Sequence, residues 1–247
     1  MTLVITEISE FGIAMAADSA LTKRIVLPSG VIMSQVLTGT QKLQYIPQLK
    51  AGISMWGFGS VRTGNGLIPT DAWIIDFISR YNDINTLERF AGALASELQL
   101  AVGDIQQPMG FHLAGYVDEN GEKLPTIYHV RNCDGPIDGQ YVIHEFVPGL
   151  QFGPQRPPVD DYYVLRNGDF GPYALLSAVV SRILPAIQQV NDITIPHPSL
   201  RGRISFHGAW INFISDLYAS AGRNRTIGGK VAAMGITPEG DVVHLSE

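Results

Sequence analysis

The sequence has little of what several protein classes require, beginning with cysteine and charge. Cys133 is the only cysteine, so no disulfide can form within the chain, and a small secreted fold held by disulfides is excluded. Charged residues make up 16% of the 247 residues, and the net charge is -6. This balance gives no electrostatic reason to bind nucleic acid or an anionic membrane, and we expect neither as a partner.

Long apolar runs and metal-ligand patterns are also missing. No stretch approaches the roughly 18 uninterrupted apolar residues of a membrane span. Glu7 and Glu10 interrupt the first apolar run, so we expect no signal peptide and a cytoplasmic protein. The six histidines never fall in a paired metal-ligand spacing, and neither a phosphate loop nor a Gly-x-Ser-x-Gly motif occurs. We therefore expect no metal and no cofactor.

The hydrophobic residues, 45% of the chain, change from strand to helix periodicity in blocks. Thr70 with Asp71, and Asn85 or Thr86, can cap the first two helices. The expected order is strands within residues 2–60, helices over 71–81 and 87–103, strands over 111–132 and 140–147, a surface loop over 148–161, helices starting near 172 and 205, with Pro185 ending or kinking the former, and a hairpin over 228–245.

This block order predicts the fold class. A doubly wound α/β protein would alternate single strands and helices, whereas here pairs of helices follow groups of strands. We therefore expect an α+β protein with two antiparallel sheets and helix pairs outside them, a four-layer α-β-β-α sandwich. The whole chain, residues 1–247, is expected to form a single domain.

Thr2 raises the question of catalysis. No leader is expected before it, and once Met1 is removed Thr2 carries a hydroxyl and a free α-amine, whose reference pKa is about 7.7 to 8.0. That amine can accept the hydroxyl proton, so Thr2 can act as a nucleophile without a histidine. While Met1 is attached, the same nitrogen is a non-basic amide.

A lysine and an acid beside Thr2 would complete such a site. A cation keeps the amine neutral near pH 7, and a carboxylate holds the cation in place. Asp18 ends the second strand and Lys42 opens a later one, both at the borders of apolar segments. Taken alone, Asp18 is better interpreted as part of a strand-end turn and Lys42 as a solvated strand end, and only together with Thr2 do they indicate a site.

Several segments together resemble a known family. Thr2, then FGIAMAADSALT, QKLQYIPQLKAGISMWGFGS and a helix pair, and the late IGGKVAAMGITPEGDVV are similar to β-type subunits of the proteasome, which are N-terminal nucleophile (Ntn) hydrolases, and point to a bacterial proteasome homologue. The 16 residues that separate Thr2 from Asp18 (18 minus 2) match the family's interval.

The resemblance implies a threonine peptidase. In it Thr2 would be the nucleophile, Asp18 and Lys42 would tune its amine, and the backbone N–H of Gly57 would bind the oxyanion. It also implies a homo-oligomeric ring or stacked rings, unfolded polypeptide as substrate, and an ATP-dependent unfoldase as a partner. The apolar helix residues expected to pack against neighbouring subunits are Trp73, Ile74, Trp210, Phe213 and Ile214.

Departures from the family pattern leave alternatives open. The interval from Thr2 to Lys42 is longer than the family leaves, which keeps Lys23 as an alternative, and MWGFGS offers Gly59 beside Gly57. The positions that depart from the family's supporting residues are Asn167, Gly168 and Asp169 in place of Gly-Ser-Gly, and Asn224 and Ile227 in place of an Asp and a Ser. A non-catalytic scaffold of the same fold and an Ntn amidase acting on a small substrate remain alternatives.

Overall fold

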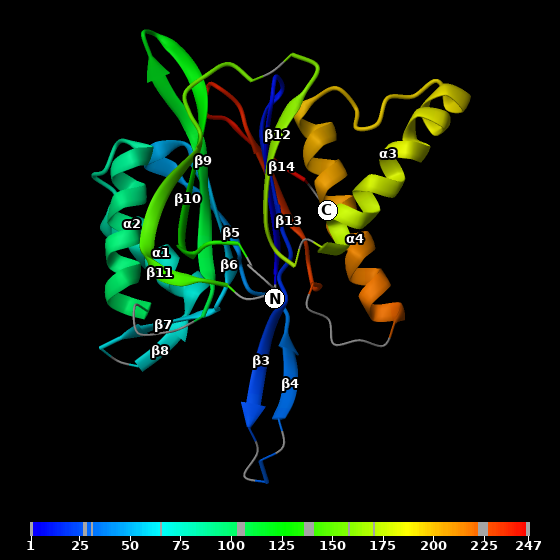
Figure 1. Ribbon diagram of the computed structural model, residues 1–247. Coiled ribbons are helices and arrows are strands. Elements are labelled where there is room, and N and C mark those ends of the chain that lie inside the picture. The colour runs from blue at the N-terminus through cyan, green and yellow to red at the C-terminus, as the bar shows by residue number, and fades with distance from the viewer. Residues whose placement is uncertain are drawn as a thin grey trace.

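The computed structural model describes residues 2–26, 29–30, 32–64, 66–102, 107–135, 141–157, 159–169, 171–221 and 227–245. Within these residues it contains two five-stranded antiparallel sheets and four α-helices. The predicted α+β class with helix pairs between groups of strands is confirmed. Figure 1 shows the two sheets stacked in the middle, with α1 and α2 outside one sheet and α3 and α4 outside the other.

The first sheet contains the most N-terminal strand, which has a neighbouring strand on each side. Its order is β12-β1-β2-β13-β14, and all neighbours are antiparallel. Its strands are β1 (Leu3–Ser9), β2 (Gly12–Ala17), β12 (Tyr162–Gly168), β13 (Ala232–Ile236) and β14 (Val242–His244). Every residue of β1 and β2 is buried, because both faces of this sheet are covered.

The second sheet has the order β11-β10-β9-β6-β5. Its strands are β5 (Leu43–Ile46), β6 (Ala51–Gly57), β9 (Met109–Glu119), β10 (Glu122–Cys133) and β11 (Ile143–Phe152). A short 3-10 helix, η1 (Pro47–Leu49), joins β5 to β6. The predicted hairpin between β9 and β10 turns at Asn120 and Gly121, which both have positive φ.

Two small hairpins lie outside the main sheets. One pairs β3 (Leu21–Val26) with β4 (Ile32–Leu37) and projects from one end of the molecule (Figure 1). The other pairs β7 (Ser60–Thr63) with β8 (Gly66–Pro69) and leads into the first helix. The strands expected within residues 2–60 include the first hairpin, whereas nearly all of the second lies beyond that range.

The helices are α1 (Thr70–Arg80), α2 (Leu87–Val102), α3 (Gly171–Asn191) and α4 (Leu200–Ser220). Thr86 accepts a hydrogen bond from the Arg89 amide at 3.3 Å, which confirms it as the cap of α2. The predicted caps of α1 are wrong in detail, because Pro69 occupies the N-cap position and Thr70 already lies inside the helix. Helix α4 begins before its predicted start, with Ser199 as its cap.

Two further expectations need correction. The expected loop over 148–161 contains the end of β11, and the strand β12 that follows it was not predicted. Pro185 does not end α3, which continues to Asn191. The strands β11 and β12 are exposed along part of their length, so the alternation of apolar and polar residues that marks a strand is weak there.

Apolar side chains fill the three spaces between the four layers of helices and sheets. One cluster joins α1 and α2 to the second sheet, with Phe77, Phe90 and Phe111 fully buried. A second lies between the sheets and includes Val4 and Ile8 of β1. A third joins the opposite face of β1 to α3 and α4. The alternation along β1 therefore directs even-numbered residues between the sheets and odd-numbered ones toward the helices.

Helix α3 differs from the other helices because only Tyr173 is buried along its length. Its exposed apolar side chains are Leu175 (73% exposed), Val179 (54%), Ile183 (49%), Ile187 (40%) and Val190 (83%). By length and composition α3 is the one helix in the described part of the chain that could cross a membrane, which for a single helix is weak evidence.

The exposed apolar side chains of the helices are mostly not the ones that were expected to pack against neighbouring subunits. Trp73, Ile74, Trp210 and Ile214 are buried within the chain, and only Phe213 of that set is exposed. Those side chains fill the layers between helix and sheet, which a count of apolar positions alone does not reveal. Among the four helices, α3 carries the most exposed large apolar side chains.

Candidate active site

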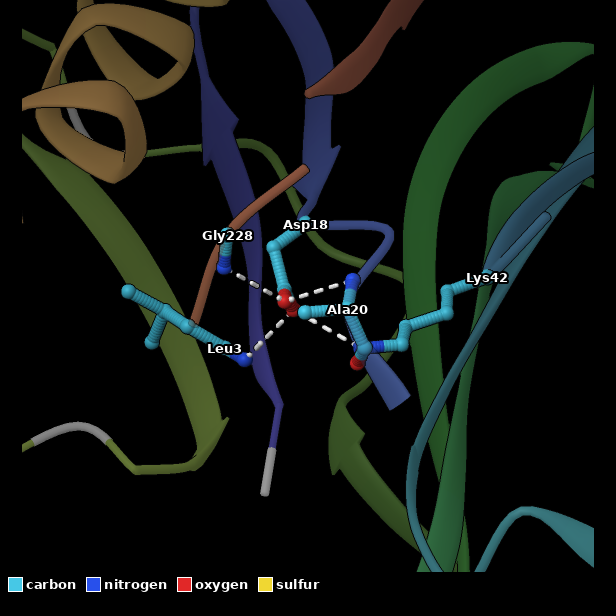
Figure 2. Close-up of polar contacts among 5 residues, drawn as sticks. All are labelled: Leu3, Asp18, Ala20, Lys42 and Gly228. Atoms are coloured by element: carbon cyan, nitrogen blue, oxygen red, sulfur yellow. Dashed lines mark hydrogen bonds and ion pairs between the residues drawn. The ribbon is translucent and has the colours of Figure 1, made fainter. Parts of the chain in front are cut away.

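The Asp18 carboxylate is the centre of the best-defined polar cluster (Figure 2). Its Oδ1 accepts hydrogen bonds from the Leu3 amide and from Lys42 Nζ, each at 3.0 Å. Its Oδ2 accepts from the amides of Ala20 and Gly228, each at 3.1 Å. Four donors from four segments of the chain thus converge on one carboxylate.

Both members of the Asp18–Lys42 pair are removed from solvent. The Asp18 residue is 1% exposed and Lys42 is 3% exposed. A buried charge is costly unless it is paired and hydrogen-bonded, and the three amides and the ammonium meet that requirement for Asp18. Burial lowers the pKa of the Lys42 ammonium from its ordinary value, and the nearby Asp18 carboxylate opposes that effect.

The backbone around Lys42 is fixed from several sides. Its Nζ also donates to the carbonyl of Ala20, and its own carbonyl accepts from the Met55 amide at 2.9 Å. At the start of α1, Asp71 accepts from the amide of Gln41 at 3.0 Å, the residue that precedes Lys42. The N-terminus of α1 therefore helps to hold the segment that carries the lysine.

Thr2 lies at the end of β1 beside Asp18, and it is 2% exposed. The peptide group that joins Thr2 to Leu3 is held on both sides. Its carbonyl accepts from the amide of Asp169 at 2.7 Å, and its N–H donates to the Asp18 carboxylate. Met1 lies outside the described residues. By the alternation along β1, Thr2 is on the same face as Val4, the face between the sheets.

Gly57 ends β6 two residues after Met55, the residue that bonds the Lys42 carbonyl. It has a φ of 87°, and a Cβ there would lie 2.1 Å from the carbonyl oxygen of Pro108. Only glycine fits this position, for conformation and for space. At Gly59 a Cβ would instead meet the side chain of Leu21 at 2.2 Å.

The structure brings together some of the predicted site residues and not others. Asp18 and Lys42 pair at the end of β2 and the start of β5, and the amide of Leu3, the residue after Thr2, donates to Asp18. Lys23 lies on β3 opposite Gln35, and its side chain is outside the described part of the chain. Asn224 also lies outside it, whereas Ile227 is fully buried in the apolar cluster beneath α3 and α4.

Three contributions to the site come from residues whose roles the sequence analysis did not assign. The amides of Ala20 and Gly228 were within segments that resemble the family, but nothing in the sequence marked them as donors to Asp18. Asp169 was noted only as a departure, and its carboxylate accepts from the Tyr218 hydroxyl at 2.8 Å. No periodicity or motif connects Tyr218 on α4 to the end of β12.

The donor set does not form a metal site. Among the described residues, no group of three or more His, Cys, Asp and Glu side chains is placed to hold a metal ion. The arrangement at Asp18 instead combines amide donors with an ammonium, which suits the stabilisation of a carboxylate.

Comparison with known proteins identifies the fold. No protein-family model matches the sequence, and no curated protein matches it. A solved structure of Anbu from Hyphomicrobium sp. strain MC1, described as a Gly-1 mutant, matches with a TM-score of 0.50. The match covers 99% of this chain and 85% of that one, at 13% sequence identity. The chain has a proteasome-like Ntn-hydrolase fold.

Anbu is a bacterial proteasome-like Ntn-hydrolase homologue, so the resemblance found in the sequence is confirmed at the level of the fold. In this proteasome-like fold the two stacked sheets and the outer helix pairs correspond to the four layers described above. At 13% sequence identity, the match establishes a similar fold and nothing about activity.

Proposed function

We propose that the chain is a threonine peptidase whose nucleophile is Thr2. The observation that supports this most strongly is the buried Asp18–Lys42 pair, at 3.0 Å, whose carboxylate also binds the amide of Leu3. A cation and an acid are thereby tied to the residue directly after Thr2. This is the arrangement that an N-terminal nucleophile needs.

The proposed reaction transfers one proton and one acyl group at each step. After removal of Met1, the Thr2 amine takes the hydroxyl proton as Oγ1 attacks the peptide carbonyl. The proton then passes to the departing amine, which leaves an ester on Thr2. Water, deprotonated by the Thr2 amine, then cleaves that ester, and the proton returns to Oγ1 of Thr2. The N–H of Gly57 donates to the oxyanion of each tetrahedral intermediate.

Lys42 and Asp18 act on the amine rather than on the substrate. The positive charge of Lys42 favours the neutral form of a nearby amine, and Asp18 fixes the direction of the ammonium. Because Lys42 is buried, its charge is weakly screened by solvent and its effect on neighbouring groups is large.

Assembly into a homo-oligomer follows from the uncovered apolar residues of α3. Five large aliphatic side chains on that helix are at least 40% exposed, a feature that stable monomers avoid. In a ring or in stacked rings this surface would be covered by other copies of the chain. An enclosed chamber would restrict substrates to unfolded polypeptides, supplied in the cytoplasm by an ATP-dependent unfoldase.

The test of the activity begins with protein shown by intact mass to lack Met1. Fluorogenic peptides should be hydrolysed, and an acylating β-lactone probe should label Thr2. Thr2→Ala should show neither turnover nor labelling, while Thr2→Ser, which keeps the hydroxyl, should retain both in part. Hydrolysis that survives in Thr2→Ala would refute the proposal, and cleavage of small amides without peptides would favour an amidase.

A non-catalytic ring protein is a second candidate because of one contact. Asp169 ends the turn Asn167-Gly168-Asp169, which replaces the family's Gly-Ser-Gly turn and its supporting serine, and the Asp169 carboxylate accepts a hydrogen bond from the Tyr218 hydroxyl. This alternative predicts a stable oligomer that the β-lactone probe does not label, even when mass spectrometry shows a free Thr2 amine.

The oligomeric state is tested separately by light scattering coupled to gel filtration. Both candidate functions require an assembly, which should exceed the 26.9 kDa of one chain several-fold. Val179→Lys places a charge within the exposed α3 face and should dissociate it. The matched control is Glu88→Lys, on the exposed side of α2. A wild-type monomer at micromolar concentration would contradict both candidates.

A further inference from the structure

A buried polar network crosses the space between the two sheets. Thr6 of β1 places its hydroxyl 2.9 Å from His112 Nδ1 on β9. The other ring nitrogen of His112, Nε2, lies 2.7 Å from Oδ1 of Asn167 on β12. One imidazole thus joins a strand of the second sheet to two neighbouring strands of the first.

The network continues within the second sheet. The indole N–H of Trp56 on β6 donates to His129 Nε2 on β10 at 3.0 Å. The rings of His112 and His129 meet edge to face, with centroids 5.2 Å apart and planes at 90°. His112 and His129 are also directly opposite each other in the β9–β10 ladder. The contacts therefore run without a gap from Thr6 to Trp56.

Burial and the hydrogen-bond partners together favour neutral forms of both histidines. The Asn167 oxygen can only accept, so His112 Nε2 carries the proton and Nδ1 accepts from Thr6. Since Trp56 can only donate, His129 Nε2 carries no proton. Burial lowers the pKa of His112 to about 4, and burial together with the charges of His112 and Arg131 lowers that of His129 to about 2. The network keeps one pattern of donors and acceptors throughout the neutral range.

The ends of the network lie next to the proposed catalytic groups. Asn167 is opposite Val4 in the sheet and precedes Gly168 and Asp169, the residue whose amide holds the Thr2 carbonyl. At the other end, Trp56 directly precedes Gly57. Its indole packs so closely on Gly110 that a Cβ at Gly110 would lie 2.8 Å from the ring.

The surroundings of these groups are apolar, which makes the polar contacts informative. Val4, Ile8, Met15, Ile127 and Met234 fill the rest of the space between the sheets. Apolar side chains of similar size could fill it equally well, since buried polar groups add little net stability. What polar contacts add is direction, because each hydrogen bond weakens steeply with misalignment.

We propose that Thr6, His112, His129, Trp56 and Asn167 form a positioning network that fixes the Thr2 end of the first sheet relative to the Gly57 end of the second. Its catalytic consequence rests on the proposed function above. The nucleophile belongs to one sheet and the oxyanion donor to the other, so the separation of the sheets sets the geometry of attack. A misplacement of about 1 Å reduces rates on the order of 100-fold.

The test removes one hydroxyl without changing its shape. Thr6→Val deletes the donor to His112, whereas Thr6→Ser keeps it. Thr126→Val is a matched control, because the Thr126 hydroxyl is buried on β10 and has no hydrogen-bond partner among the described residues. In protein that lacks Met1, Thr6→Val should lower kcat ten- to 100-fold with KM unchanged. Thr6→Ser and Thr126→Val should stay near the wild type.

A second measurement is independent of activity. Hydrogen exchange read by mass spectrometry should rise about tenfold in Thr6→Val for the segments that contain Leu3 and Asp169, and stay unchanged at β13. Trp56→Phe, which removes the indole N–H together with part of the ring, should raise it in the segment with Gly57. Exchange in both variants that matches Thr126→Val would overturn the proposal. If the wild type proves inactive, the proposed function fails and exchange alone decides the positioning role.

Discussion

Two buried carboxylates of the first sheet, Asp18 and Glu7, are each 1% exposed but are satisfied in different ways. Asp18 accepts four hydrogen bonds, two on each oxygen. Glu7 has one well-formed partner, His207 of α4, at 2.8 Å, while Arg203 Nε lies 3.5 Å from its other oxygen. Arg203 also lies over the ring of Tyr162, at 4.9 Å from its centroid.

The difference separates a site from a structural contact. The donors to Asp18 are three backbone amides and one ammonium, and they fix the direction of the carboxylate and of Lys42. Glu7 connects one strand to one helix, and Glu7 Oε1, Arg203 Nε and His207 Nδ1 have no hydrogen-bond partner within the described residues. We expect loss of Lys42 or Asp18 to affect activity and loss of the Glu7 contact to affect stability.

The largest effect is expected from Lys42→Ala. Removal of the cation leaves the Thr2 amine harder to keep neutral, so peptide hydrolysis should fall on the order of 1,000-fold, within the range of proton-transfer catalysis. Lys50→Ala is the control, because Lys50 is exposed and its Nζ donates to the carbonyl of Glu239, away from Asp18. Full activity in Lys42→Ala together with loss in Lys23→Ala would transfer the role to Lys23.

Asp18→Asn should combine a smaller kinetic loss with a clear loss of stability. The new amide nitrogen would face the N–H donors of Ala20 and Gly228, and Lys42 would lose its counter-charge. Breaking a buried ion pair costs about 3–5 kcal/mol. Denaturant unfolding measures this cost, and a variant as stable as the wild type would show that the four donors do not depend on the charge.

Glu7→Gln provides the other half of the comparison. The amide keeps the shape and weakens the contact with His207, so the free energy of unfolding should fall by about 1–3 kcal/mol. Peptide hydrolysis by the folded variant should stay within about twofold of the wild type, because Glu7 faces α4 and not Thr2. A strong loss of activity at full stability would remove the distinction between the two carboxylates.

The smallest effect concerns the pH dependence of stability, since the Asp18 charge opposes the effect of burial on Lys42. The folded-state pKa of Lys42 is below the unfolded value of 10.5, so between these two values the unfolded chain binds more protons. Stability contributed by this group should therefore rise with pH across that window. Denaturant unfolding of the wild type and of Lys42→Met would show the slope in the wild type alone.

Much of the fold was predictable because the deciding signals are local. Glycine-containing turns mark the hairpins after Asp118 and Pro238, and apolar spacing marks α2 with its cap at Thr86. The strand β12 was missed because it follows a proline-rich stretch and lies at a sheet edge, where alternation is weak. The burial of Trp210 depends on packing against parts of the chain that are distant in sequence, and no local sequence pattern predicted it.

The contacts of the site also divide into those that local sequence features predicted and those that depend on long-range packing. Asp18 and Lys42 were predictable as residue types at strand ends, and a resemblance connected them to Thr2. The pairing of Asp169 with Tyr218 spans 49 positions, and that of Thr6 with His112 spans 106. Such contacts depend on how sheets and helices stack, which a single sequence expresses only through burial shared by many residues.

Gly168 has a consequence for how relatives of this chain diverge. Its φ is 91°, and a Cβ there would lie 1.7 Å from the carbonyl oxygen of Thr2, so any side chain would displace the chain end itself. Gly57 is under a similar steric limit from Pro108. Chemistry can be lost in a lineage while these limits persist. A relative that has exchanged Thr2 or Lys42 should still carry the glycine at position 57, whereas a relative with the serine of the family's Gly-Ser-Gly turn at position 168 must hold the Thr2 peptide differently.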